Sequence, residues 1–160
     1  MTEFKVLPIE NMIRLYPELP KQYSFKKGDI QIITITRDEK YEYNFTPLVE
    51  LDFDDITKQD LNVMDKDIQK KFTFVSEKHV ERVVEKLPEI KNAHIIFVCC
   101  DAGLSRSPAV AQALAHYLGE GREYCNLSYR YPFANNDVFE TMLLGLQKHT
   151  QNIVNSKSVK

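Results

Sequence analysis

Short apolar runs alternate with amphipathic segments along this chain, and the alternation predicts strands interleaved with helices. Residues 30–36 are rich in β-branched side chains, and residues 95–98 form an uninterrupted apolar run. The second run suits the centre of a parallel sheet, where a strand is covered on both faces. Residues 4–8 and 47–53 carry shorter strand patterns. These patterns predict a sheet of four or five strands.

Helical periodicity marks the segments around these strands. Apolar residues recur at i, i+3, i+4 and i+7 from Val80 to Leu87, after a predicted N-cap at Ser76, and Pro88 is expected to end this helix. Residues 57–71 are strongly charged and are expected to be irregular or a poorly packed helix. Further helices are predicted over residues 10–16, 107–118 and 136–149.

Strands that alternate with helices indicate a layered α/β fold. We expect a single domain with a central, mainly parallel sheet that is flanked by helices. The domain is predicted to span residues 1–151, and residues 152–160 are predicted to be a disordered tail. The length of 160 residues suits one domain that buries a core without metals or disulfides.

Composition narrows the class of protein without identifying an activity. Hydrophobic residues make up 43% and charged residues 28% of the chain, which are ordinary globular values. The net charge of −2 gives no basis for binding nucleic acid or an anionic membrane, and no apolar run approaches the roughly 20 residues of a membrane span. The N-terminus lacks the apolar core of a signal peptide. Three cysteines, two of them adjacent, do not make a disulfide framework, so we expect a cytoplasmic protein.

The most informative chemistry lies in residues 94–110, with the sequence HIIFVCCDAGLSRSPAV. Here an apolar strand leads into Cys100, Arg106 follows six residues later, and Ser107 and Pro108 begin a predicted helix. This order places a thiol, a guanidinium and a row of backbone N–H groups around one anion-sized concavity. It predicts a phosphate-binding loop with a cysteine nucleophile at its floor.

A cysteine nucleophile needs help, because a free thiol with a pKa of about 8.5 is mostly protonated at neutral pH. A helix N-terminus and Arg106 are both expected to stabilise the thiolate of Cys100. Gly103 permits the backbone geometry of a tight loop, and Ser107 is expected to donate a hydrogen bond to the sulfur. The planar fork of Arg106 suits two phosphate oxygens. The residues predicted to bind phosphate are Asp101, Ala102, Gly103, Leu104, Ser105 and Arg106.

The Cys-x5-Arg-Ser motif between a buried strand and a helix resembles the cysteine-based protein tyrosine phosphatases. The form Cys-x-x-Gly-x-x-Arg-Ser-Pro is most similar to the dual-specificity branch, in particular to its small single-domain microbial members. The likeness is tight over residues 94–118 and looser, in element order, over residues 28–148. It implies a protein tyrosine or dual-specificity phosphatase that hydrolyses phosphomonoesters through a phosphocysteine and needs no cofactor.

That family also uses an aspartate on a separate loop to protonate the leaving oxygen. Matching the apolar positions Leu51 and Phe53 to the family's strand places this acid at Asp55, with Asp54 as the next candidate. Asp52 is expected to point away from the loop. The alternative is that Asp54 and Asp55 belong only to a solvated turn or a helix cap.

Two departures from the family pattern bear on the site. Cys99 stands where a histidine is common before the nucleophile, and the absence of tryptophan favours the dual-specificity branch over the tyrosine-specific enzymes. Adjacent side chains on a strand point to opposite faces, so we expect Cys99 to be a buried apolar residue rather than a redox partner. Cys125 is expected to pack within the fold, with a protective disulfide to Cys100 as the alternative.

Other conspicuous residues are expected to be structural. His79 and His116 lie on predicted helices without the spacing of a metal site, so we predict no metal. Asn135 matches an asparagine often found at the start of the last helix in the microbial relatives, where capping explains it. The aromatic run over residues 124–133 is expected to pack the last helix onto the sheet, and bordering a substrate cleft is the alternative.

The substrate class follows in part from charge. The loop interior, Asp-Ala-Gly-Leu-Ser, has no lysine, which favours a singly phosphorylated group such as phosphotyrosine over a substrate with several phosphates. We expect a phosphorylated protein or a small phosphomonoester as substrate and leave the oligomeric state open. Two other functions remain: a non-catalytic phosphopeptide-binding pseudophosphatase, and a redox or sulfur-transfer protein of the rhodanese or arsenate-reductase type.

Overall fold

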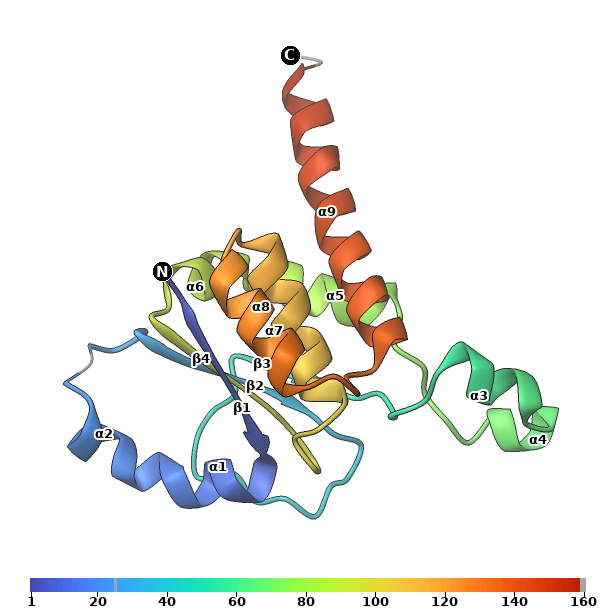
Figure 1. Cartoon of the computed structure of the whole chain (residues 1–160), viewed down its shortest axis with the longest axis horizontal. Helices are drawn as coiled ribbons and strands as arrows, with labels where there is room; N and C mark the ends of the chain where they lie inside the picture. The colour runs from blue at the N-terminus through green and yellow to red at the C-terminus, as the bar shows by residue number, and fades with distance from the viewer. Residues whose placement is uncertain (25, 159–160) are drawn as a thin grey trace.

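Four parallel strands form one sheet at the centre of the fold (Figure 1). The computed structural model describes residues 1–24 and 26–158. β4 pairs with β1 on one side and with β2 on the other, so the uninterrupted apolar run occupies the interior of the sheet, as predicted. The strands are β1 (Glu3–Pro8), β2 (Ile30–Ile35), β3 (Val49–Leu51) and β4 (Ile95–Cys100), in the spatial order β1-β4-β2-β3.

Helices cover both faces of the sheet, which confirms the predicted α/β class (Figure 1). One face carries α1 (Ile9–Leu15), the 3₁₀ turn η1 (Tyr16–Glu18) and α2 (Leu19–Gln22). The other face carries α5 (Glu77–Val84), α6 (Leu87–Asn92), α7 (Arg106–Tyr117), α8 (Gly121–Arg130) and α9 (Asn136–Ser158). Every residue of α7 from Arg106 to Ala115 is buried, because this helix lies between the sheet and the pair α8 and α9.

Successive residues of β4 face opposite cores. Val98 and Cys100 pack in the larger core, which the sheet shares with α5 to α9. Phe97 and Cys99 pack in the smaller core, against α1 and α2. The period of two in a strand therefore directs the Cys100 thiol toward α7 and the Cys99 thiol away from it.

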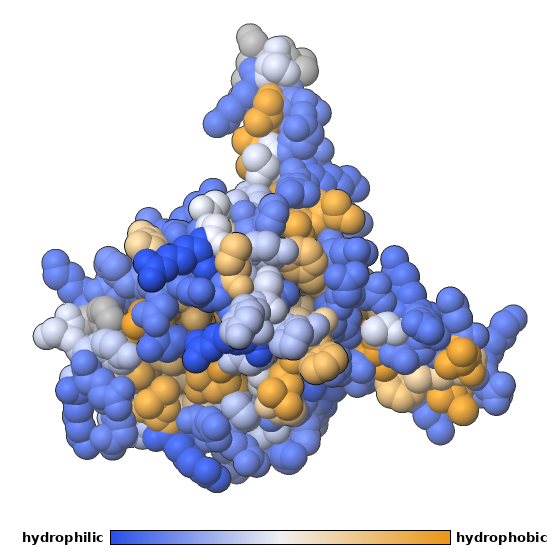
Figure 2. Space-filling model, viewed as in Figure 1, coloured by the Kyte–Doolittle hydropathy of each residue, from blue (hydrophilic) through white to orange (hydrophobic). Residues whose placement is uncertain are grey.

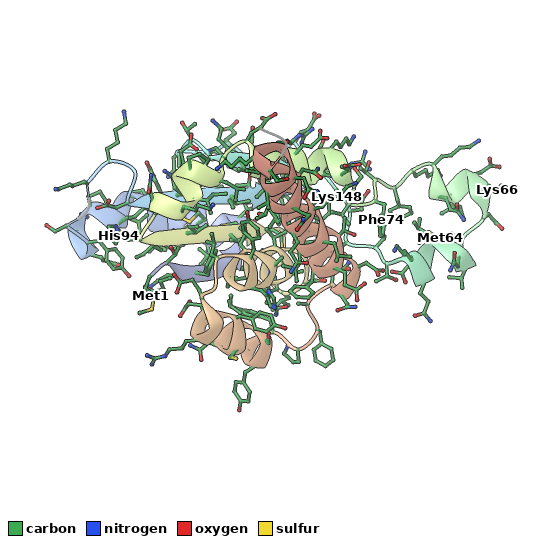
Figure 3. The ribbon with its side chains drawn as sticks, turned by 90° about the horizontal axis from the view of Figure 1, so that it is seen from above. Met1, Met64, Lys66, Phe74, His94 and Lys148 are labelled. Atoms are coloured by element: carbon green, nitrogen blue, oxygen red, sulfur yellow. The ribbon has the colours of Figure 1, made fainter. Side chains whose placement is uncertain are left out.

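α3 (Lys58–Val63) and α4 (Lys66–Gln69) project from the body as a small helical pair, with Met64 and Lys66 at its far end (Figures 1 and 3). Local bonds hold this charged segment in shape. Thr57 and Asp60 form a capping box, and Gln69 Nε2 donates to the Leu61 carbonyl at 2.7 Å. Hydrophobic side chains gather on the projection (Figure 2), and Val63 is 82% exposed. The segment is thus helical with little packing, the second of the two predicted forms.

Several predicted boundaries were wrong. Pro88 does not end a helix but lies in the first turn of α6, where its missing N–H is no loss. The strand predicted over residues 47–53 is confined to β3. Residues 121–130 form α8, for which only a packing aromatic run was predicted. On and beyond α8 that run is divided: Tyr124 stacks on Phe139, whereas Tyr129 is 89% exposed.

The last helix is longer than predicted. α9 continues to Ser158 rather than ending near residue 149, because neither proline nor glycine follows Gly145. Residues 152–158 of the predicted disordered tail are therefore helical, and residues 159–160 lie outside the described part. Among the described residues, no helix combines the length and apolar character needed to cross a membrane.

Candidate functional site

The carboxyl ends of the parallel strands gather the candidate site at one edge of the sheet. β4 ends at Cys100, and residues 101–105 lead from it into α7. Cys100 Sγ lies 3.1 Å from Ser107 Oγ and accepts a hydrogen bond from the Gly103 amide at 3.3 Å. The thiol is therefore enclosed by its own loop, and Cys100 is 2% exposed.

Gly103 lets the loop pack directly on the end of β1. Its φ is +68°, in the left-handed region that favours glycine. A Cβ at this position would lie 2.6 Å from Pro8 N and 2.7 Å from the Leu7 carbonyl carbon. Both the backbone angle and the close approach therefore require glycine here.

Arg106 turns back across the loop from the start of α7. Its Nη1 donates to the Phe53 carbonyl at 3.0 Å, and its Nη2 donates to the Asp101 carboxylate at 2.5 Å. Its Nε is buried and has no hydrogen-bond partner within residues 1–24 and 26–158. An unpaired buried N–H costs about 1–3 kcal/mol, so this donor favours the binding of an acceptor.

Asp101 is anchored between three donors. Thr36 Oγ1 donates to it at 2.8 Å, and Tyr41 and Arg106 also bind its carboxylate. Burial opposes ionisation of Asp101, but the hydrogen bonds from these three residues outweigh it, so its pKa lies below the ordinary value. Burial, together with the bond to Asp101, raises the pKa of Tyr41 to about 12. At neutral pH the pair is therefore a carboxylate and a neutral hydroxyl.

Asp55, the first candidate for the general acid, lies against the loop. Its Oδ1 accepts hydrogen bonds from Ser105 Oγ at 2.8 Å and from Asn135 Nδ2 at 3.0 Å. Asp55 and Arg106 also line the same hollow. The cap of α3 is Thr57, so Asp55 is not that helix's N-cap. Three segments far apart in sequence thus meet at one carboxylate oxygen.

Asp54, the second candidate, lines the same hollow, but other groups bind its carboxylate. Its Oδ2 accepts hydrogen bonds from Arg37 Nη1 at 2.8 Å and from the Thr73 amide at 2.6 Å. These bonds tie the segment after β3 to residues 71–73 and to the end of β2. The surroundings of Asp54 therefore indicate a structural carboxylate.

Asp52 points away from the loop, as predicted, and binds α5. Its Oδ1 lies 2.7 Å from Arg82 Nη1 and 3.1 Å from His79 Nε2. His79 is buried, and its Nδ1 accepts a hydrogen bond from the Ser76 amide at 3.0 Å. Burial lowers the pKa of His79 despite the attraction of Asp52. This histidine is therefore neutral, with its proton on Nε2.

Asn135 caps α9, as its position predicted, and it also binds Asp55. Its Oδ1 accepts from the Val138 amide at 3.2 Å, which caps α9, while its Nδ2 donates to Asp55 and, at 3.1 Å, to the Ile56 carbonyl. An amide side chain is both donor and acceptor, unlike the carboxylate of aspartate. The choice of asparagine at this N-cap is the sequence signal that could have indicated its second contact.

The other two cysteines lie away from the Cys100 sulfur. Cys99 is fully buried on the opposite face of β4, and burial, with Cys100 nearby, raises the pKa of its thiol. Cys125 is exposed on α8, so the prediction that it packs within the fold was wrong. All three cysteines are free. Across the part of the chain that the structure describes, no three His, Cys, Asp or Glu side chains are grouped to hold a metal ion.

Comparisons with known proteins show which solved structures the fold resembles. A scan against protein-family models and a search of curated proteins give no match. Among solved structures, the chain is similar to the crystal structure of PTPMT1, with a TM-score of 0.51 and 11% identity over 96% of this chain and 95% of that chain. It is also similar to the crystal structure of Tk-PTP in the active form, with a TM-score of 0.41 and 17% identity over 91% and 88%. At 11% identity, the first likeness is one of fold.

Proposed function

We propose that this chain, which has the fold of the cysteine-based protein tyrosine phosphatases, is a protein tyrosine or dual-specificity phosphatase that acts through a phosphocysteine. The observation that carries the proposal is the hydrogen bond from Ser105 to Asp55 at 2.8 Å. It ties a candidate acid to the loop that holds Cys100 and Arg106. A nucleophile, an anion-binding arginine and an acid then act on one phosphate.

In the first proposed step the Cys100 thiolate attacks phosphorus in line. The P–S bond forms, the P–O ester bond breaks, and Asp55 transfers its proton to the leaving oxygen. Ser107 Oγ and the Gly103 amide, at 3.1 and 3.3 Å, support negative charge on the sulfur. Arg106 binds the phosphate oxygens and stabilises the charge that develops on them, with its unpaired Nε as one donor.

In the second step the phosphocysteine is hydrolysed. The Asp55 carboxylate accepts a proton from water, whose oxygen attacks phosphorus as the P–S bond breaks. Inorganic phosphate leaves and the Cys100 thiolate is regenerated. The Ser107 hydroxyl, 3.1 Å from the sulfur, helps it to leave by donating a hydrogen bond. Asp55 has regained the proton that the next cycle needs.

The geometry supports hydrolysis over the two other functions. A binding module needs the loop and Arg106 but has no use for an acid held beside them. A redox cycle needs a second thiol close to the first, whereas Cys99 faces the other core and Cys125 is exposed on α8. Neither alternative accounts for the bonds that Ser105 and Asn135 make to Asp55.

Steady-state hydrolysis of a chromogenic aryl phosphate tests this function. The wild type should turn over the substrate with a bell-shaped pH profile and should be inhibited by vanadate, and Cys100→Ser should be inactive. Tight binding of a phosphopeptide without turnover would favour the pseudophosphatase. Turnover of thiosulfate or arsenate instead would favour the sulfur-transfer or redox protein.

A further inference from the structure

The hollow beside Arg106 contains two arginines, and an acid within its lining neutralises each of them. Arg37 pairs with Asp54 at 2.8 Å, and Arg106 pairs with Asp101 at 2.5 Å. The phosphate-binding element at the floor of the hollow is thus an arginine that shares its charge with a carboxylate. These two pairs contribute no net positive charge to the hollow.

Three more acids line this hollow, and none of them pairs with an arginine in the described part of the chain: Asp38, Glu39 and Asp55. Within residues 1–24 and 26–158, the side-chain donors to Asp55 are the neutral groups of Ser105 and Asn135. Asp38 pairs at 3.0 Å with the exposed Lys40, which does not line the hollow. Glu39 is exposed. Asp55 carries a proton in the proposed first step and Asp38 is paired with Lys40, so among the described residues Glu39 supplies the unpaired negative charge at the rim that these three acids form.

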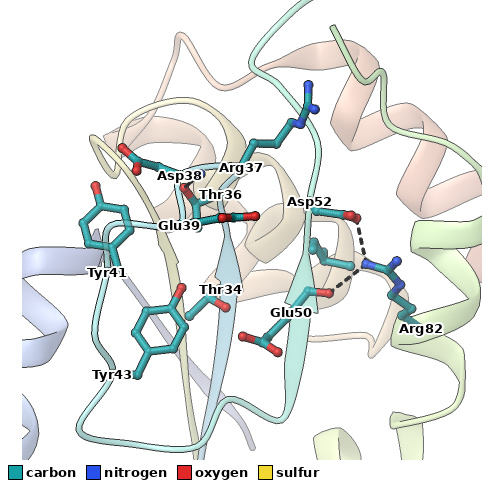
Figure 4. Close-up of a pocket in the computed structure, with 11 residues that line it drawn as sticks. Thr34, Thr36, Arg37, Asp38, Glu39, Tyr41, Tyr43, Glu50, Asp52 and Arg82 are labelled. Carbon is teal, nitrogen blue, oxygen red and sulfur yellow. Dashed lines mark hydrogen bonds and ion pairs between the residues drawn. The ribbon is translucent and has the colours of Figure 1, made fainter. Parts of the chain in front are cut away.

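A second hollow lies next to the first along the sheet edge and is also lined by acidic side chains. It shares Arg37, Asp38 and Glu39 with the first and reaches β3 and α5. Figure 4 shows Glu39 and Glu50 in the space between Tyr41, on the loop after β2, and Arg82, on α5. Arg82 is already paired with Asp52 at 2.7 Å. The Tyr41 ring already has the Lys40 ammonium over it at 5.0 Å. Among the described residues that line this hollow, Glu39 and Glu50 are carboxylates outside any ion pair, and carboxylates bind lysine and arginine.

Arg106 provides a second observation, because it is a cationic side chain with an unpaired donor in the lining that also contains these acids. The residue is only 9% exposed, it lines the first hollow, and its buried Nε lacks a partner among the described residues. A buried donor of this kind favours an acceptor such as a phosphate oxygen. The site therefore has a donor for an anion at its floor and acidic side chains at its rim.

We propose that the substrate is a basic phosphopeptide segment, with lysine or arginine side chains next to the phosphorylated residue. The inference rests on the proposed function, because it assumes that Arg106 receives the phosphate of the substrate. The phosphate binds at the floor while the cationic flanks lie over Glu39 and Glu50. An acidic flank would place like charges together, which opposes binding.

Binding of two matched peptides tests this specificity without relying on turnover. Both carry a non-hydrolysable phosphonate analogue of phosphotyrosine, one between lysine and arginine residues and the other between aspartate and glutamate residues. Fluorescence anisotropy with the full chain should give an affinity at least about tenfold higher for the basic peptide at low salt, and the ratio should shrink in high salt. Equal affinities, or tighter binding of the acidic peptide, would overturn the proposal.

Variants that remove charge test whether Glu39 and Glu50 cause the preference for the basic peptide. Glu39→Gln with Glu50→Gln should lower the ratio of basic to acidic affinity at least about threefold, because long-range attraction is lost. Asp65→Asn with Asp67→Asn removes the same charge from exposed positions of the projecting α3–α4 segment and should leave the ratio unchanged. An unchanged ratio in the Glu39 and Glu50 variant, or an equal fall in the control, would contradict the assignment.

Hydrolysis measurements separate this inference from the proposed function. Failure of the wild type to hydrolyse any aryl phosphate, combined with preferred binding of the basic peptide, would reject the catalytic proposal and retain the specificity. Aryl phosphate turnover with no preference between the peptides would reject the specificity and retain the catalytic proposal. Absence of both turnover and phosphopeptide binding would reject both.

Discussion

Ser105 Oγ donates a hydrogen bond to Asp55 Oδ1 at 2.8 Å. The bond joins the loop after β4 to the segment after β3, and these segments are 50 residues apart in sequence. Asn135, at the start of α9, binds the same oxygen at 3.0 Å. Because two donors from different segments bind Oδ1, the orientation of the Asp55 carboxylate is fixed. Oδ2 is the oxygen that these two bonds leave for the proton. This arrangement underlies the predictions about the acid.

Replacement of the two aspartates distinguishes their roles. Asp55→Asn should lower kcat roughly 10²- to 10⁴-fold for an aryl phosphate with a poor leaving group, because the leaving oxygen then receives no proton. The loss should be much smaller for a dinitrophenyl phosphate, whose leaving group needs no acid. Asp54→Asn should change kcat only a few-fold and lower the free energy of unfolding by about 1 kcal/mol. A fall in kcat for Asp54→Asn as large as that for Asp55→Asn would contradict the assignment.

Asn135 positions Asp55 in addition to capping α9, and two substitutions separate these contributions. Asn135→Ala should lower both kcat for the poor-leaving-group substrate and the free energy of unfolding, the latter by about 1 kcal/mol. Asn135→Ser retains a capping oxygen but lacks the amide that binds Asp55, so it should recover stability without recovering kcat. Recovery of kcat in the serine variant would show that capping alone accounts for the residue.

Glycine is required at position 103 because of its backbone angle and because a Cβ there would clash with the backbone at Pro8. Gly119, which has the backbone angle without the clash, is the matched control. Both have positive φ, +68° and +76°, but a Cβ on Gly119 meets nothing within 4 Å. Gly119→Ala should therefore cost only the strain of the left-handed region, about 1–2 kcal/mol. Gly103→Ala should lower the free energy of unfolding by about 3 kcal/mol or more, because its Cβ also meets the backbone at Pro8. Urea unfolding compares the two, and equal losses would exclude the contact.

Because His79 is buried, we expect the free energy of unfolding to fall on mild acidification. A histidine in the unfolded chain binds a proton near pH 6.5, whereas burial lowers the pKa of His79, so the unfolded state takes up the proton first as the pH falls. The free energy of unfolding should be fully retained above that pH and should decline below it until the folded pKa is reached. His79→Gln should flatten this decline, because it removes the buried titrating group.

The NMR titration of the His79 ring in the wild type provides a test that needs no variant. Protonation at Nδ1 would break the hydrogen bond from the Ser76 amide. The ring should therefore titrate below the pH at which a free histidine does. Titration at or above pH 6.5 would contradict the account.

Local patterns in the sequence were sufficient for the sheet and for the loop. The apolar run before Cys100 predicted the buried central strand, and its period of two placed Cys99 and Cys100 on opposite faces. The spacing of Cys100, Gly103 and Arg106 predicted one tight loop, and the structure brings Gly103 and Ser107 to the sulfur. These features depend on neighbours in sequence, which is why they could be predicted.

Features that depend on distant contacts could not be predicted. The order of the two acid candidates, Asp55 before Asp54, was predicted, but their contacts with Arg37, Ser105 and Asn135 were not, because these residues come from three other segments. The continuation of α9 to Ser158 was missed because polar, exposed residues also suit a tail. α8 was missed because its aromatic residues share no single buried face. The pairing of Asp101 with Arg106 likewise has no signature in spacing.

Trapping of the covalent intermediate tests the central claim most directly. Asp55→Asn, mixed with dinitrophenyl phosphate and quenched in acid, should accumulate a phosphate group, because the first step proceeds without an acid while hydrolysis lacks its base. Peptide mass spectrometry should locate that phosphate on Cys100, and Cys100→Ser should show neither the adduct nor turnover. Phosphate on another residue, or full turnover by Cys100→Ser, would contradict the account.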